Sequence, residues 1–156
     1  MTYIENVFAC IAAPLLVAAL CAERGHARFF IFAIAGMFAC LLSAYVNTFF
    51  AALLDASLLE ATAEIAPVVE EIMKLLPLVF YLLVFEPEGD RIRAAILVTA
   101  VGFATFENVC YLIENGAEDL GFLLIRGFGT GAMHIVCGVI VGYGMVYVWP
   151  RGALRA

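Results

Sequence analysis

Residues 67–85 read PVVEEIMKLLPLVFYLLVF, an almost unbroken apolar run that contains two adjacent glutamates and a lysine. As a helix this run would rise about 28 Å, close to the ~30 Å hydrocarbon core of a bilayer. Charged side chains are expensive at that depth, and those that occur there usually serve a function. The run therefore predicts a membrane-spanning helix and marks Glu70, Glu71 and Lys74 as candidate functional residues.

The whole chain is too apolar for a water-soluble domain. Its 156 residues are 65% hydrophobic, with a mean hydropathy of +1.05. We therefore expect an all-α, multi-pass protein of the cell membrane, folded as one helical domain over residues 1–156, with the lipid bilayer as its surroundings and no nucleic acid as a partner. With Pro67–Phe85, the expected spans number five, the others being Asn6–Ala22, Phe29–Leu54, Ala94–Ile113 and Leu120–Trp149.

The distribution of charge predicts the orientation, because Lys and Arg accumulate in short cytoplasmic loops. In a five-span arrangement the loop arginines all fall on one face, and the loops of the other face carry acidic residues only. This places the N-terminus outside and the C-terminus in the cytoplasm. The arginines are Arg24, Arg28, Arg91, Arg93, Arg151 and Arg155, and the acidic residues are Glu5, Asp55, Glu60, Glu114, Glu118 and Asp119.

Three further local features carry expectations. The acidic segment Asp55–Glu64 is expected to form a short interfacial helix, and Pro67 to start the helix after it. The first span is expected to stay in the protein, because no Lys or Arg precedes it as in a signal peptide. Small residues four apart should let helices approach closely and would allow a homo-oligomer; they are Ala35, Ala39 and Ser43 in the second span and Gly138 and Gly142 in the fifth.

Polar residues on three spans are expected at one depth. Glu71 lies fourteen residues from Phe85, Glu107 thirteen from Ala94 and His134 fifteen from Trp149. At 1.5 Å per residue, all three stand about 20–22 Å from the cytoplasmic boundary. This level is in the outer half of the membrane, where water could reach a shallow cavity.

Helical spacing predicts which of these polar side chains lie on the same face of a helix. Lys74 is four residues from Glu70 and three from Glu71, so it can pair with one carboxylate and leave the other to titrate. Arg126 shares a face with His134. Each residue also has a structural interpretation: an ion pair that fixes helix register for Lys74, a hydrogen-bonded core residue for His134, an interfacial snorkelling residue for Arg126 and a belt residue for Tyr111.

Three motifs follow one another on successive spans: Pro67-x-x-Glu70-Glu71-x-x-Lys74, Phe106-Glu107-Asn108-x-x-Tyr111, and His134 in a glycine-rich helix. In this order they resemble the PrsW family of intramembrane proteases, distant relatives of the CAAX prenyl proteases. The resemblance implies hydrolysis of peptide bonds in membrane-anchored substrates such as anti-sigma factors, near the outer face of the membrane. It also implies a catalytic set made of Glu70, Glu71, Glu107 and His134.

The mechanism expected from these residues begins with Glu70 or Glu71 acting as general base on a water molecule. Glu107 and His134 would position that water or, with Glu71, hold a metal that lowers its pKa. Zinc stays an open alternative because only one histidine belongs to the set. Four residues could support the reaction by stabilising the oxyanion: Lys74, Asn108, Tyr111 and Arg126.

Two other functions use similar residues. A proton-coupled carrier also places carboxylates, a lysine and a histidine within the membrane, although here the first two spans carry no motif. A non-catalytic scaffold of the same superfamily would have lost its glutamates, which this chain keeps. A Glu71→Gln change separates the three functions: it should stop proteolysis in a protease, change ion-dependent flux in a carrier, and affect only assembly or stability in a scaffold.

Overall fold

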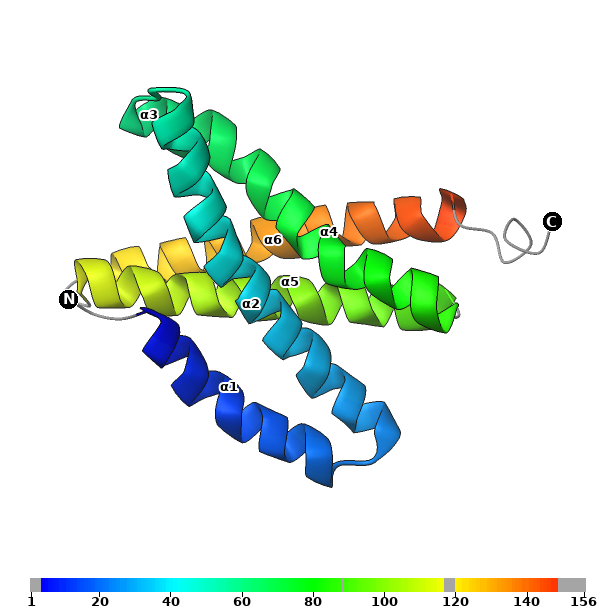
Figure 1. Cartoon of the computed structure of the whole chain (residues 1–156). Coiled ribbons are helices and arrows are strands. Elements are labelled where there is room, and N and C mark those ends of the chain that lie inside the picture. The colour runs from blue at the N-terminus through cyan, green and yellow to red at the C-terminus, as the bar shows by residue number, and fades with distance from the viewer. Residues whose placement is uncertain (1–3, 88, 117–119, 149–156) are drawn as a thin grey trace.

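The computed structural model describes residues 4–87, 89–116 and 120–148, and every element in these ranges is a helix (Figure 1). The prediction of an all-α fold with five long helices is confirmed. Trp149, Arg151, Arg155, Glu118 and Asp119 lie outside the described residues. The long helices are α1 (Ile4–Cys21), α2 (Arg24–Leu53), α4 (Ala66–Phe85), α5 (Gly89–Asn115) and α6 (Leu120–Val148).

Four of these helices, α1, α2, α5 and α6, are long and apolar enough to cross a membrane. The fifth, α4, has 20 residues and therefore a length of about 30 Å, but it carries Glu70, Glu71 and Lys74 within that length. The chain is an integral membrane protein, and the long helix that stands outside this set of four is the one that carries the paired glutamates. Which side of the membrane each end faces stays a prediction.

Two helices extend beyond the expected apolar spans. Helix α2 begins at Arg24 rather than Phe29, and α5 begins at Gly89 rather than Ala94. The sequence estimate counted apolar residues, whereas a helix continues through polar residues because its backbone hydrogen bonds do not depend on side-chain polarity. The basic residues at these two ends therefore lie on helical turns instead of in loops.

The segment between α2 and α4 is helical over a shorter range than the expected Asp55–Glu64. Asp55 adopts a left-handed backbone with φ of 51°, and helix begins only at α3 (Leu58–Glu60). Ser57 caps this turn: its side chain accepts from the Glu60 N–H, while the Glu60 carboxylate accepts from the Ser57 N–H and hydroxyl, which lowers the pKa of Glu60. The chain then continues through a π-helical stretch, η1 (Ala61–Ile65), directly into α4.

Helices α2 and α5 cross in close contact because each places a glycine at the crossing. A Cβ atom on Gly36 of α2 would overlap the Thr99 carbonyl, and one on Gly102 of α5 would overlap the Ala33 carbonyl. Helix α6 packs on α5 through Gly138 and Gly142, as expected, against Ala100 and Ile96. Of the small residues expected in α2, Ala39 and Ser43 are buried and Ala35 is half-buried.

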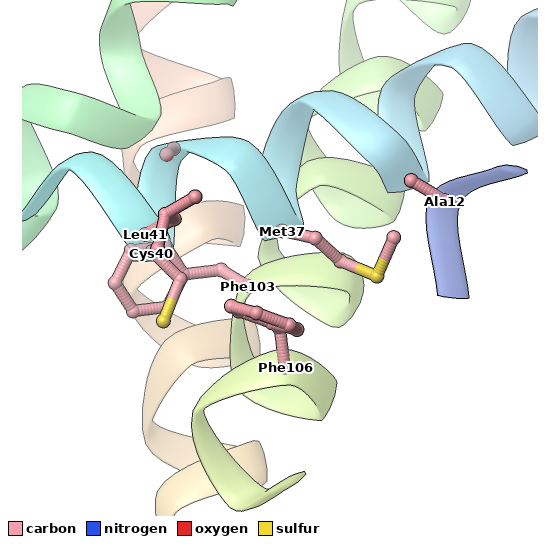
Figure 2. Close-up of a cluster of buried hydrophobic side chains, with 7 residues drawn as sticks. Ala12, Met37, Cys40, Leu41, Phe103 and Phe106 are labelled. Carbon is pink, nitrogen blue, oxygen red and sulfur yellow. The ribbon is translucent and has the colours of Figure 1, made fainter. Parts of the chain in front are cut away.

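One apolar cluster joins α1, α2 and α5 (Figure 2). Phe103 and Phe106 of α5 are fully buried in it, beside Met37 and Cys40 of α2 and Ala12 of α1. The Phe103 ring also reaches the polar residues of α4 and α6, since its centroid lies 4.6 Å from the Lys74 Nζ and 4.9 Å from the His134 ring centroid. The core of the bundle therefore forms one wall of the charged region.

Helices α2 and α4 lie close together next to α3 and diverge toward their other ends, where α5 lies beside α4 (Figure 1). A second cluster packs the three helices together at the wide end. Its members are Phe32, Leu78, Tyr81, Leu82, Ile92, Ala95 and Ile96. The charged residues of α4 thus lie at the narrow end of a wedge.

Candidate functional site

The structure brings Glu71, Lys74, His134 and Glu107 together from three helices. Lys74 Nζ lies 2.6 Å from Glu71 Oε1, one turn earlier on α4, and 2.9 Å from His134 Nδ1 on α6. His134 Nε2 lies 2.6 Å from Glu107 Oε2 on α5. Glu107 Oε1 continues the chain of contacts by accepting from Arg126 Nη2 at 3.2 Å. We call these five residues, Glu71, Lys74, His134, Glu107 and Arg126, the charge network.

The middle of the charge network is shielded from solvent. Lys74 is 5% exposed and His134 is 1% exposed, whereas Glu71 and Glu107 are half-buried. The lysine lies over the Phe103 ring, so a cation–π contact adds to its two hydrogen bonds. Burial of this ammonium is tolerated because all its neighbours are acceptors or a ring face.

The contacts define the state of the histidine. An ammonium can only donate, so Nδ1 of His134 is the acceptor from Lys74. The proton of a neutral ring is then on Nε2, which donates to the Glu107 carboxylate. Both ring nitrogens are engaged, and the histidine links a cation on one side to an anion on the other.

Arg126 is held on three sides at the other end of the charge network. Besides Glu107, its guanidinium donates to Asn108 Oδ1, and its Cζ lies 3.8 Å from the centroid of the Tyr111 ring. Thr130 Oγ1 also donates to Asn108 Oδ1, at 3.3 Å. The second motif and α6 thus fix the arginine. A snorkelling Arg126 with its head in the headgroup region would not make these contacts.

Glu70 differs from the other two site glutamates. It is half-buried, and it makes no hydrogen bond or ion pair with any residue in the described ranges. Adjacent residues of a helix point about 100° apart, so Glu70 faces away from the Lys74 pair that Glu71 makes. The spacing allowed Lys74 to pair with either carboxylate, and the structure shows the pair with Glu71.

A cavity of about 640 Å³ lies beside Glu70, and we call it the Glu70 cavity. Four of the candidate site residues line it: Glu70, Glu107, Tyr111 and Arg126. Lys74, His134, Asn108 and Glu71 are not among the residues that line it. Its other walls come from the ends of α1 and α2, including Glu5, whose carboxylate accepts a hydrogen bond from Tyr45.

Asn47 of α2 was not predicted as a site residue. It lines the Glu70 cavity, and its Oδ1 is buried without a hydrogen-bond partner among the described residues. An unpaired buried carbonyl oxygen costs about 1–3 kcal/mol, so it marks a place where a donor is missing. An asparagine in an otherwise apolar span was the available signal for it.

The arrangement does not fit a resident zinc ion. The facing donors of His134 and Glu107 are 2.6 Å apart, whereas two donors on one tetrahedral zinc, each about 2.0–2.1 Å from the ion, lie about 3.3 Å apart. The other nitrogen of His134 faces the Lys74 ammonium, which would repel a cation. Within residues 4–87, 89–116 and 120–148, no group of three His, Cys, Asp or Glu side chains could hold a metal.

The order of motifs over α4, α5 and α6 agrees with a comparison against protein families. The model of the PrsW family, described as intramembrane metalloproteases, matches residues 8–155, nearly the whole chain. Neither the comparison with curated proteins nor that with solved structures found a match. With a match this long, the resemblance seen in the motifs is confirmed, and the chain belongs to the PrsW family of intramembrane proteases.

Proposed function

We propose that the chain is an intramembrane endopeptidase that hydrolyses peptide bonds in the Glu70 cavity. The observation that carries the proposal is the Glu70 carboxylate, which has no hydrogen bond or ion pair among the described residues and lines the same cavity of about 640 Å³ as Arg126. A carboxylate that can act as a base and a fixed cation that line one cavity are two groups that amide hydrolysis needs. The family membership supports the same reaction.

Of the paired glutamates, Glu70 is the general base in this proposal. Glu71 is bound to Lys74 at 2.6 Å and lies outside the Glu70 cavity, so a base role would require it to leave the charge network. Glu107 uses one oxygen for His134 and the other for Arg126. A base role for Glu107 would therefore compete with the contacts that both of its oxygens already make.

The proposed step balances without another reactant. Glu70 takes a proton from a water molecule, whose oxygen forms a bond to the carbonyl carbon of the substrate. The tetrahedral intermediate carries its negative charge on the former carbonyl oxygen, and the guanidinium of Arg126 donates to it. The C–N bond then breaks, and protonated Glu70 returns the proton to the leaving nitrogen.

Arg126 suits the oxyanion better than the other supporting residues do. It lines the Glu70 cavity, and among the described residues its guanidinium, which has five N–H donors, uses two of them, for Glu107 and Asn108. Lys74 does not line this cavity and is committed to Glu71 and His134. In this proposal His134 and Lys74 are positioning residues, because they hold Glu107 and through it the arginine.

A substrate backbone would supply the donor that Asn47 lacks. An extended peptide presents N–H groups that pair readily with a carbonyl acceptor on a cavity wall. Asn47 of α2 lines the same cavity as the α5 residues Glu107 and Tyr111. We place the substrate chain between these two helices, with its scissile carbonyl toward Arg126.

The substrate class and the setting follow from the family resemblance and from the sequence. The proposed substrates are membrane-anchored proteins of the cell membrane, such as anti-sigma factors, cut near the outer face. Homo-oligomer formation through small-residue faces also stays a prediction. No step of the proposed mechanism uses a metal ion.

The test compares new N-terminal peptides in membranes that contain the wild-type chain, Glu70→Gln or Glu64→Gln. Glu64 is the matched control: it lies on η1, six residues before Glu70, and its side chain is exposed. We expect the wild type and Glu64→Gln to produce the same new termini in single-span proteins, and Glu70→Gln to produce none at equal abundance.

Other outcomes would contradict the proposal. Equal profiles from wild type and Glu70→Gln would remove the general-base role. An ion flux that depends on Glu70, without new termini, would support a proton-coupled carrier. Loss of a partner complex alone would support a scaffold.

A further inference from the structure

A second large cavity lies at the wide end of the wedge between α2 and α4. Its volume is about 820 Å³, and it shares no lining residue with the Glu70 cavity. Helix α2 contributes Ile31 and Phe32, and α4 contributes Phe80, Tyr81 and Phe85. We call it the α2–α4 cavity. Its size is within the range of about 300–1,000 Å³ typical of ligand sites.

The shape of α4 helps to explain the opening. Pro77 lines the α2–α4 cavity from inside α4, and an internal proline removes one helix hydrogen bond and kinks the helix. Phe32 of α2 and Tyr81 of α4, which both line the cavity, stack edge to face with ring centroids 4.9 Å apart. The two helices therefore remain in contact through these rings. Exposed Ile31, Phe80 and Phe85 leave the cavity walls apolar.

Two arginines stand at one end of this apolar space. Arg28 of α2 and Arg91 of α5 line the α2–α4 cavity, and both also line an adjoining cavity of about 210 Å³. Among the described residues, Arg28 donates only to the Arg24 carbonyl, and Arg91 makes no hydrogen bond or ion pair. Two guanidinium groups without carboxylate partners favour an anion, above all a phosphate.

One acidic residue also borders the space. Glu86 follows α4, and its exposed side chain lines the α2–α4 cavity. Together with Arg28 and Arg91, this glutamate gives the residues that line the cavity a net charge of +1. Apolar walls with a net positive end match an amphiphile that has an acyl chain and an anionic headgroup.

We propose that the α2–α4 cavity binds one glycerophospholipid, with its phosphate between Arg28 and Arg91 and one acyl chain along the apolar walls. The ligand would join α2, α4 and α5 at the end of the bundle where they diverge. Since it binds the folded chain only, it should raise the stability of the fold in proportion to its concentration. The site is separate from the proposed proteolytic site and does not rest on it.

The experiment uses the purified full chain, freed of lipid in a non-ionic detergent and titrated with phosphatidylglycerol. Native mass spectrometry counts bound lipids, and thermal denaturation follows stability. The test variant is Arg28→Gln with Arg91→Gln. The matched control is Arg93→Gln, since Arg93 lies on the same turn of α5 but pairs with Asp90 and contacts the Tyr143 ring.

We expect the wild type and Arg93→Gln to bind one phosphatidylglycerol and to gain thermal stability. The double variant should bind at least about tenfold more weakly, because each arginine near a lipid phosphate contributes to affinity. Equal binding by the double variant and the wild type would overturn the proposal. So would equal binding of phosphatidylglycerol and an uncharged diacylglycerol by the wild type.

Two further arms separate a lipid from a free phosphate. Inorganic phosphate and glycerol 3-phosphate, which lack acyl chains, should give no comparable gain in stability; a gain equal to that from the lipid would make this a phosphate site and refute the lipid proposal. Ala35→Leu fills the apolar part of the cavity and should weaken lipid binding while both arginines remain. Unchanged binding by Ala35→Leu would contradict the placement of the acyl chain.

Discussion

Lys74 and His134, sixty residues apart in the sequence, are joined by a buried contact of 2.9 Å between Nζ and Nδ1. This contact links α4 to α6 and determines which groups donate and which accept along the charge network. Because the lysine donates, the histidine must donate from its other nitrogen to Glu107. Hydrogen bonds through His134 and Glu107 therefore connect Arg126, which lines the Glu70 cavity, to a lysine that does not line it.

Lys74→Met should destabilise the fold. It leaves His134 Nδ1 and Glu71 without their donor, and removing one partner of a buried pair costs about 3–5 kcal/mol, less here because the Glu71 side chain is 34% exposed. Thermal denaturation in detergent measures the loss. The double variant Lys74→Met with Glu71→Gln should lose less than the sum of the two single variants, since it removes both charges. If the loss of stability in the double variant equals the sum of the losses in the single variants, Lys74 and Glu71 do not stabilise each other.

Glu70→Gln should reduce the turnover number of a purified, reconstituted enzyme by about 10²–10⁴-fold, the usual contribution of a general base. Its melting temperature should match that of the wild type, because Glu70 has no hydrogen bond to lose within the described ranges. Glu71→Gln should instead lower stability through Lys74. A Glu70→Gln enzyme that cleaves at the wild-type rate while Glu71→Gln is folded and inactive would reverse the two assignments.

Asn47→Ala should weaken substrate binding more than it slows the chemical step. A lost hydrogen bond of about 0.5–1.5 kcal/mol corresponds to a rise in KM of roughly two- to tenfold. The turnover number should change little, since Asn47 makes no hydrogen bond to the charge network among the described residues. Asn115→Ala is the control, because Asn115 caps the end of α5 by donating to the Tyr111 carbonyl. A fall in turnover number with constant KM would argue against a binding role.

The sequence alone was sufficient to predict that residues of α4, α5 and α6 meet. Helix rise is constant, so residues at similar distances from the ends of spans stand at similar depths, and Glu71, Glu107 and His134 lie in one network. The depth of a residue, however, does not tell which way its side chain points around the helix axis. For that reason the sequence did not distinguish Glu70 from Glu71 or show that Arg126 lines the Glu70 cavity and Lys74 does not.

The sequence also did not predict the close crossing of α2 and α5, and the reason here is different. Small residues are common in membrane spans, and Ala35, Ala39 and Ser43 are as suitable by spacing as the glycine actually used, Gly36. Only the position of the opposing Thr99 carbonyl decides between them. Asn47 was missed because the first two spans carry no family motif, although its polarity in an apolar span was visible.

Purified wild-type chain should contain well under one zinc ion per molecule, because His134 has no free nitrogen and Lys74 lies beside it. Metal analysis of protein purified without chelators measures this directly. A chelator such as EDTA should leave proteolysis unchanged. Stoichiometric zinc that disappears in His134→Ala would show that Lys74 leaves the histidine in the active protein.

Gly36→Ala should destabilise the fold by more than the usual cost of overpacking, about 1–3 kcal/mol, because its Cβ would meet backbone atoms of α5 that cannot rotate away. The α2–α5 crossing carries both the Glu70 cavity and the core around Phe103, so activity should fall with stability. Gly144→Ala is the control: its Cβ would meet nothing within 4 Å, and alanine favours helix. Thermal denaturation of the two variants in one detergent compares them. Equal melting temperatures would mean that α2 and α5 are not in contact at Gly36 in solution.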